Sequence, residues 1–192
     1  MHLPTSTKLA IKRVDNVFDN VGSCRRLLRE VQLLRAMGHH RNIISLADVI
    51  EPSGQKSAFN SLYYAFEYMP MNLLQLMCCY EKLTAFHVKV ITFNVMCGLK
   101  FMHSAGVMHR DLKADNILVD KKCTAKICDF GMARQTSDLV NPKTVLHGCY
   151  QFVKENKYTE DSENLSSEEV KKVTLDPKVF EAAVKDYKGI MK

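Results

Sequence analysis

The sequence predicts an α+β fold in which a small, strand-rich part precedes a helical part. Three observations support this prediction. Residues up to about 70 are rich in strand-like stretches, residues 72–106 show helical periodicity, and a hairpin pattern follows at 116–130. The 192 residues are 46% hydrophobic and 25% charged, which is typical of a globular chain with enough apolar side chains to form a core.

The strand-rich part contains three predicted strands and one helix. Residues 8–14, KLAIKRV, have strand composition, and residues 25–37, RRLLREVQLLRAM, place apolar side chains at helical spacing. Residues 42–52 and 61–69 are rich in β-branched and aromatic side chains and are separated by the turn sequence PSGQKS. We therefore expect these two stretches to form adjacent strands.

The helical part contains two predicted helices and a hairpin. Residues 72–80 and 84–106 have helical periodicity, and the longer helix is expected to stop at Gly106. The stretches NILVD (116–120) and AKICDF (125–130) flank the turn residues KKC and predict a short hairpin packed against these helices.

Residues 136–192 differ in character from the rest of the chain. Residues 136–172 are mostly polar, so we expect partly irregular and flexible structure there. Asp176 can cap a helix that has Pro177 at its first position, which predicts a helix near 177–188 with one apolar face. We expect this helix to cover apolar surface of the predicted helix 84–106; the alternative is a helix that binds a partner.

Charge and cysteine content bound the function classes. The formal net charge is +6, but Lys and Arg are spread among acids, so charge alone does not indicate a nucleic-acid partner. Seven cysteines form no CxxC pair, and their odd number favours a reduced compartment, the cytoplasm or the nucleus. We find no signal-peptide core and no apolar run near the roughly 18 residues of a membrane span, so no membrane partner is expected.

The stretch HRDLKADN, residues 109–116, and the triplet DFG, residues 129–131, carry the chemistry. Transfer of a phosphoryl group from ATP to a hydroxyl requires a carboxylate to orient the hydroxyl, divalent metal on the phosphates and a cation near them. HRDLKADN matches the catalytic-loop pattern H-R-D-L-x-x-x-N, and DFG follows it at the distance of a hairpin. Either motif alone can arise by chance, but the ordered pair rarely does.

On these motifs the sequence resembles eukaryotic protein kinases, and among them the mitogen-activated protein kinase group with its stress-activated and nemo-like branches. The resemblance extends from about Lys8 to Arg134 and includes the stretch AIKRVDNVFDNVGSCRRLLREVQLLRAMGHHRNIISLADVIEP. It implies a partial two-lobed kinase-like fold. Residues 1–71 would be part of the small lobe with the hinge, 72–135 would begin the large lobe, and 136–192 would be a divergent tail.

The resemblance implies catalytic and metal-binding roles for the two motifs. Asp111 would be the catalytic base toward the substrate hydroxyl, and Lys113 would steady the transferred phosphoryl group. Asn116 and Asp129 would bind Mg²⁺, which prefers oxygen ligands. Ala114 stands where these kinases usually carry Pro, which is a small departure from the pattern.

Lys12, in the predicted strand LAIK, lies where the family has its phosphate-binding lysine. Glu30 is placed on the following helix to pair with it. Because Glu30 is three residues from Leu27 and four from Leu34, it borders the apolar stripe of that helix and is expected to point inward.

The resemblance also implies an adenine site. Phe66 would control the back of the ATP pocket, and the backbone of Glu67–Met69 would bind adenine as the hinge of the family does. Ala10 and Leu118 would lie on the two faces of the base. Each of these residue types is also common in ordinary strands and cores.

Some features of the family are not found. The resemblance implies two strands and a Gly-rich loop before Lys12, but the eleven residues before it contain no glycine. No Thr-x-Tyr pair occurs between residues 131 and 192, and no A-P-E-like anchor is recognisable there. We therefore expect a truncated or divergent kinase with an ATP site that is open on one side.

The predicted function is that of a protein serine/threonine kinase of the mitogen-activated type, which transfers the ATP γ-phosphate to protein Ser/Thr hydroxyls with Mg²⁺. Ser/Thr specificity rests on Lys113 in DLKADN. The expected partners are ATP and protein substrates, together with an upstream kinase or scaffold. The alternative is a catalytically inactive kinase-like protein that binds a partner kinase or scaffold.

Overall fold

Lys12 lies on β1 (Leu9–Val14), the first strand of an antiparallel sheet of three strands. The computed structural model describes residues 8–50, 61–79 and 83–135, and in this part the strand order is β1-β3-β2, with β3 at Leu62–Glu67 and β2 at Leu46–Ile50. Ala10 pairs with Phe66 and Lys12 with Tyr64. Because side chains alternate along a strand, this register places all four on one face of the sheet.

The helix α1 (Val21–Met37) follows β1 and begins earlier than its apolar periodicity predicts. The side chain of Asn20 accepts hydrogen bonds from the backbone N–H groups of Gly22 (2.7 Å) and Ser23 (3.3 Å). This N-cap satisfies amides that the first turn leaves unpaired, so the helix begins at Val21 despite the glycine. Glu30 is 4% exposed, as the helical spacing predicts.

The predicted strand at 42–52 forms only from Leu46, because residues 42–44 bind a different strand. The N–H of Ile44 donates to the carbonyl of Ile127, and the N–H of Ile127 donates to the carbonyl of Asn42, both at 2.9 Å. The Asn42 side chain also donates to the Ala125 carbonyl at 2.9 Å. Residues 42–44 therefore connect the first sheet to the rest of the molecule.

The remaining described elements form the helical part. Two helices are present, together with two small sheets in the orders β4-β6-β7 and β5-β8. The elements are α2 (Leu73–Cys79), α3 (Ala85–Ser104), β4 (Met71–Asn72), β5 (Val107–Met108), β6 (Ile117–Val119), β7 (Ala125–Ile127), β8 (Arg134–Gln135) and the 3₁₀ helices η1 (Ala114–Asn116) and η2 (Phe130–Met132). The predicted hairpin is β6 and β7, which pair in antiparallel register.

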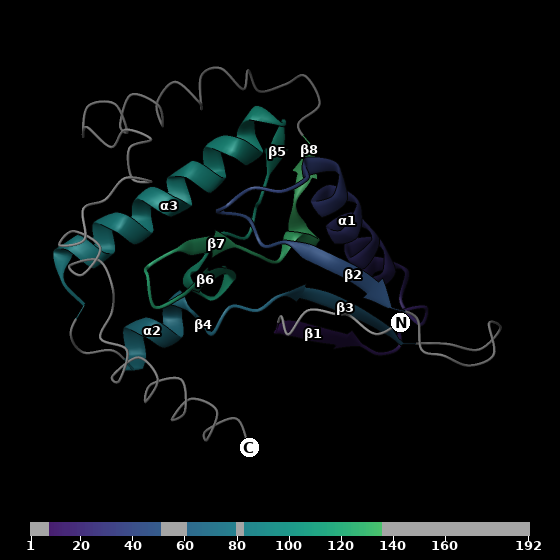
Figure 1. Cartoon of the computed structure of the whole chain (residues 1–192). Coiled ribbons are helices and arrows are strands. Elements are labelled where there is room, and N and C mark those ends of the chain that lie inside the picture. The colour runs from purple at the N-terminus through teal and green to yellow at the C-terminus, as the bar shows by residue number, and fades with distance from the viewer. Residues whose placement is uncertain (1–7, 51–60, 80–82, 136–192) are drawn as a thin grey trace.

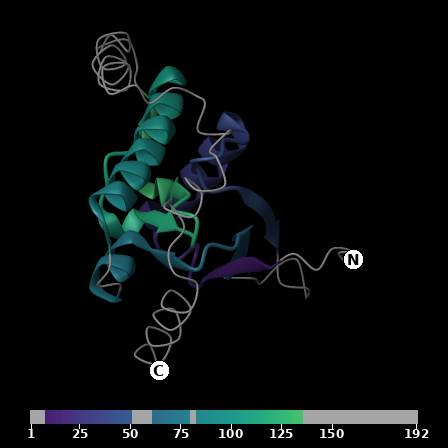
Figure 2. The same ribbon diagram turned by 60° about the vertical axis from the view of Figure 1, so that its left-hand side comes forward.

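Two hydrophobic clusters hold these elements together. One joins α2, α3 and the β4-β6-β7 sheet, and the other joins α1 and residues 43–44 to α3, β7 and η2. Figures 1 and 2 show the first sheet and α1 on one side, and α2, α3 and the β6–β7 hairpin on the other. The second cluster therefore connects the two parts.

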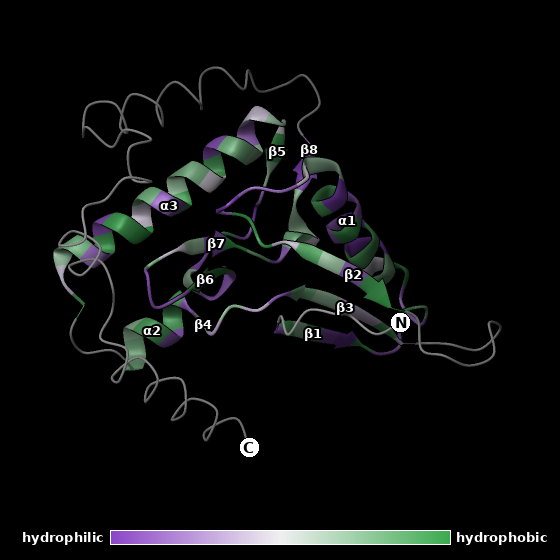
Figure 3. Ribbon diagram, in the orientation of Figure 1, coloured by the Kyte–Doolittle hydropathy of each residue, from purple (hydrophilic) through white to green (hydrophobic). Residues whose placement is uncertain are grey.

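The helix α3 is more apolar than the sequence analysis expected, as the green shades along it in Figure 3 indicate. By length and composition alone it could cross a membrane, so the expectation that no apolar run approaches that length was wrong. The core helix of a globular domain passes the same test. Here Ile91 and Met102 are buried in the two clusters, and Gly98 lies so close to residue 42 that an added Cβ would stand 2.8 Å from the Asn42 carbonyl oxygen.

The helix predicted near 177–188 lies outside the described residues. The irregular segment predicted at 136–172 also lies outside them.

Candidate active site

A cavity of about 270 Å³ lies where β1, α1, β3 and the β6–β7 hairpin meet. Eight predicted site residues line it, and Ile44 and Cys128 complete its wall. The eight are Ala10, Lys12, Glu30, Phe66, Glu67, Met69, Leu118 and Asp129. Residues from both parts of the molecule thus meet around one space, as the resemblance implies.

Lys12 and Glu30 form an ion pair at this cavity. The Lys12 Nζ atom lies 3.0 Å from Glu30 Oε2. The lysine side chain is 43% exposed and the glutamate side chain 6%, and both residues line the cavity. The pair places a cation at the position that the resemblance assigns to a phosphate contact.

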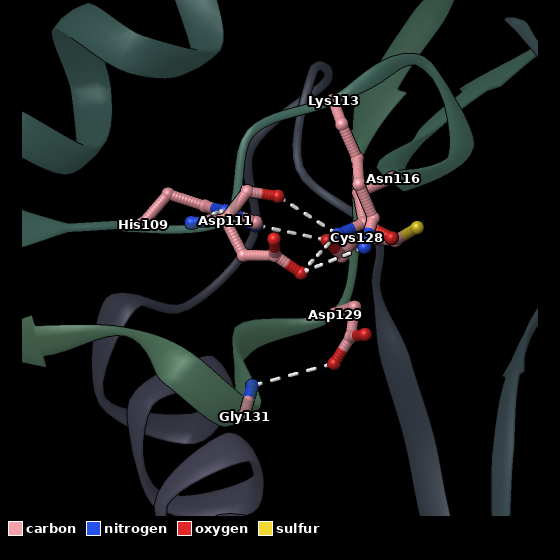
Figure 4. Close-up of polar contacts among 7 residues, drawn as sticks. All are labelled: His109, Asp111, Lys113, Asn116, Cys128, Asp129 and Gly131. Atoms are coloured by element: carbon pink, nitrogen blue, oxygen red, sulfur yellow. Dashed lines mark hydrogen bonds and ion pairs between the residues drawn. The ribbon is translucent and has the colours of Figure 1, made fainter.

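The loop residues Asp111, Lys113 and Asn116 lie beside the cavity and do not line it. The Asn116 Nδ2 atom donates to the Asp111 carbonyl oxygen at 2.8 Å and to Asp111 Oδ2 at 3.0 Å. Lys113 Nζ lies 3.2 Å from the same Oδ2 atom. Figure 4 shows these side chains gathered next to Asp129.

The backbone connects this loop to Asp129. The N–H of Cys128 donates to the Asn116 carbonyl oxygen at 3.0 Å. Asp129 itself adopts a left-handed conformation, with φ 63° and ψ 76°, and its Oδ1 atom accepts from the N–H of Gly131 at 3.4 Å. A residue other than glycine in this region is uncommon, so the surrounding contacts must hold it there.

His109 and Phe130 support the two motifs from inside the core. The His109 Nε2–H donates to the Cys128 carbonyl at 2.9 Å, and Nδ1 accepts from the N–H of Asp111 at 3.3 Å. The rings of His109 and Phe130 meet edge to face, with centroids 5.2 Å apart, and both residues are buried. The imidazole thus bridges the HRDLKADN loop and the residue before the DFG turn.

Arg29 ties α1 to the DFG turn. Its Nη1 atom donates to the Gly131 carbonyl at 2.5 Å. Burial lowers the pKa of the Arg29 guanidinium, and the neighbouring cations Arg134, Arg110 and Arg26 lower that pKa further. Arg29 is therefore the cation that contacts the DFG turn directly.

The pKa of Asp111 is lowered from its ordinary value of 3.8, first by the hydrogen bond from Lys113; burial opposes this, and the charge of Lys113 and the hydrogen bond from Asn116 lower the pKa by lesser amounts. We expect Lys113→Met to raise this pKa, because the largest stabilising contact of the carboxylate is then lost. Stability from the contact is present above pH 3.8 and is lost as the pH falls through the lowered pKa. A ¹³C NMR titration of the Asp111 carboxyl group measures the change.

Lys113→Arg keeps the positive charge and serves as the control for this titration, and Lys121→Met removes an exposed lysine elsewhere. An unchanged Asp111 pKa in Lys113→Met would contradict the assigned cause.

Two cavity residues were missed by the sequence analysis. Cys128 directly precedes Asp129, and this adjacency was a usable signal. Burial, with the nearby carboxylate of Asp129, raises the pKa of its thiol to about 12, so the wall there is an uncharged thiol. Ile44 had no such signal, because its position depends on the pairing of residues 42–44 with β7.

Comparison with known proteins identifies the family. The model of the family "Protein kinase domain" matches residues 1–168, which extends the similarity beyond both Lys8 and Arg134. Mitogen-activated protein kinase 1 of Oryza sativa subsp. japonica is 43% identical over 134 residues, which are 70% of this chain and 33% of the rice protein. Mitogen-activated protein kinase 6 of Arabidopsis thaliana is 43% identical over 138 residues, 72% of this chain and 34% of that protein.

A third relative shows the same pattern. Serine/threonine kinase NLK of Caenorhabditis elegans is 41% identical over 127 residues, which are 66% of this chain and 20% of that protein. The chain thus spans about a third or less of the length of these curated relatives. The match of residues 1–168 to the family model makes the chain a member of the protein kinase domain family.

Proposed function

We propose that this chain binds MgATP and acts as a protein serine/threonine kinase of the mitogen-activated type. One observation carries the proposal. The Lys12–Glu30 ion pair and Asp129 lie on the wall of one cavity. The Asp111–Asn116 pair is joined to the residue before Asp129, because the N–H of Cys128 donates to the Asn116 carbonyl. Phosphoryl transfer depends mainly on such positioning of charges around the phosphates.

The donor set next to the cavity suits Mg²⁺. Asn116 donates to Asp111 through its Nδ2 atom, and Asp129 accepts from Gly131 through its Oδ1 atom. Among the described residues, no donor contacts the remaining side-chain oxygens, Asn116 Oδ1 and Asp129 Oδ2. These two oxygens are hard ligands of the kind that Mg²⁺ shares with phosphates and water. Asn116 and Asp129 would hold the ion, and the bound ion would neutralise charge on the phosphate oxygens.

The other residues would position the nucleotide and the hydroxyl. Lys12 would contact the phosphates, and Glu30 would keep the Lys12 amine directed into the cavity. The backbone of Glu67–Met69 would bind the adenine edge, with Ala10 and Leu118 against its faces. Phe66 would limit the depth of the pocket.

Asp111 would act on the substrate hydroxyl. With a lowered pKa it is ionised at neutral pH, so it would orient the hydroxyl for in-line attack and accept its proton as the new P–O bond forms. Lys113, whose Nζ atom lies 3.2 Å from Asp111 Oδ2, would steady the transferred phosphoryl group.

Thermal unfolding with and without MgATP tests the nucleotide site. At MgATP about a hundredfold above its Kd, we expect the free energy of unfolding to rise by about 2.7 kcal/mol. Lys12→Met and Asp129→Asn should abolish most of this rise, because they remove the phosphate contact and a metal ligand. Asp15→Asn, at an exposed carboxylate, should keep it.

The outcomes separate the two candidate functions. No stabilisation of the parent chain by MgATP would contradict any nucleotide-dependent role. Stabilisation without phosphate transfer to Ser/Thr peptides would instead support a catalytically inactive protein that binds a partner kinase or scaffold.

We propose protein substrates, an upstream kinase or scaffold, and a cytoplasmic or nuclear location on family likeness and cysteine usage. No disulfide joins the six cysteines within the described residues.

A further inference from the structure

A lysine is buried on β7, next to the cavity wall. The Lys126 side chain is only 10% exposed. Lysine is almost never buried so deeply without a partner, because removing an ammonium group from water is costly. Its Nζ atom lies 3.0 Å from Glu67 Oε1. An ion pair thus joins β7 to the hinge, residues Glu67–Met69.

Glu67 is also bound to the segment between α1 and β2. Its Oε1 atom accepts from the N–H of Ser45 at 2.7 Å, and its own N–H donates to the Ser45 carbonyl at 3.1 Å. Glu67 lines the cavity, whereas Ser45 and Lys126 do not belong to its lining. The contacts of Glu67 Oε1 are thus made with residues outside the cavity lining, while Glu67 itself borders the cavity.

Lys126, the other member of the pair, is fixed beside Leu118, the β6 residue that forms what we call the cavity floor. Lys126 pairs with Leu118 across the β6–β7 hairpin, and Leu118 lines the cavity. The strand neighbours of Lys126 bind residue 42 of the connecting segment, since Ala125 accepts from the Asn42 side chain and Ile127 donates to the Asn42 carbonyl. Lys126 is thus fixed relative to the floor, and Glu67 is fixed relative to Lys126.

From this geometry we propose that Glu67 and Lys126 are positioning residues that hold the hinge backbone at a set distance and orientation from the cavity floor. Neither charge needs to touch the nucleotide. The pair acts through the hinge backbone, so that the N–H and C=O groups of residues 67–69 that Ser45 does not occupy face the base without reorganisation. This inference rests on the proposed nucleotide-binding function.

Three variants test the pair. Glu67→Gln keeps an oxygen that can accept from the Ser45 N–H but removes the charge, Lys126→Met replaces the ammonium group with an apolar end, and the double variant removes both charges. Asp15→Asn and Lys122→Met repeat the same chemical changes at exposed positions and serve as controls. Each protein is measured by MgATP titration and by amide hydrogen exchange.

We expect each single variant to bind MgATP roughly tenfold more weakly, and the double variant to lose little more than either single one, because the two residues act as one unit. Hinge amides at 67–69 should exchange faster, while amides in the middle of α3 keep their protection. The control variants should match the parent in both measurements.

Hinge exchange that stays unchanged in both single variants would overturn the proposal. So would exchange that rises equally in the hinge and in α3, because the pair would then serve only global stability. Independent, additive losses of affinity would also overturn it. A parent chain that binds no MgATP would refute the proposed function instead, and hydrogen exchange would still decide whether the pair orders the hinge.

Discussion

Replacing Phe130 by alanine is expected to lower the free energy of unfolding by about 3–5 kcal/mol. The Phe130 side chain is fully buried and lies in the cluster that joins α1, α3 and β7. The change would leave a cavity in that cluster and remove the edge-to-face contact with His109. Denaturation by urea, followed by circular dichroism, measures the loss.

The magnitude matters because a domain of this kind has a total stability of only about 5–15 kcal/mol. Phe86→Ala is the matched control, since Phe86 is 41% exposed at the start of α3, and its loss should stay within about 0.5 kcal/mol. A loss below about 1 kcal/mol for Phe130→Ala would mean that the cluster does not depend on this ring.

Asp111→Asn is expected to slow phosphate transfer to a Ser/Thr peptide by a factor of about 10² to 10⁴. The affinity for MgATP should stay nearly the same, because Asp111 does not line the cavity. The loop should also keep its shape, because Asn116 still donates to the backbone carbonyl of residue 111. Transfer rates at saturating MgATP and a separate binding titration measure the two effects.

Asp115→Asn is the control for this experiment. It makes the same chemical change four residues along the loop, at an exposed carboxylate in η1, and should leave the transfer rate close to that of the parent. An Asp111→Asn protein that transfers phosphate at the parent rate would show that this carboxylate has no part in the chemistry.

Much of the local structure was predictable because it depends on residues close together in the sequence. The spacing of Leu27, Glu30 and Leu34 predicted both the helix and the inward position of Glu30, which is buried against Lys12. The hairpin of β6 and β7 followed from two short apolar runs around a turn. The start of α1 was missed because Asn20 was not recognised as its cap.

Contacts between distant residues were harder to predict. The strand expected at 42–52 forms only from Leu46, since residues 42–44 bind β7, far along the chain. Ile44 reaches the cavity wall for that reason alone. The ion pair of Glu67 with Lys126 was likewise not foreseen, because each looks like a surface charge when its strand is considered alone.

The sequence by itself determined which elements form and which chemical groups are available, because periodicity, caps and motifs act over a few neighbouring residues. The convergence of Lys12, Asp111, Asn116 and Asp129 was inferred from family likeness; packing of the two parts places Lys12 and Asp129 on one cavity and Asp111 and Asn116 beside it. Only the tertiary structure decided how the hinge is held, because that depends on burial and on the pairing of charges from separate elements.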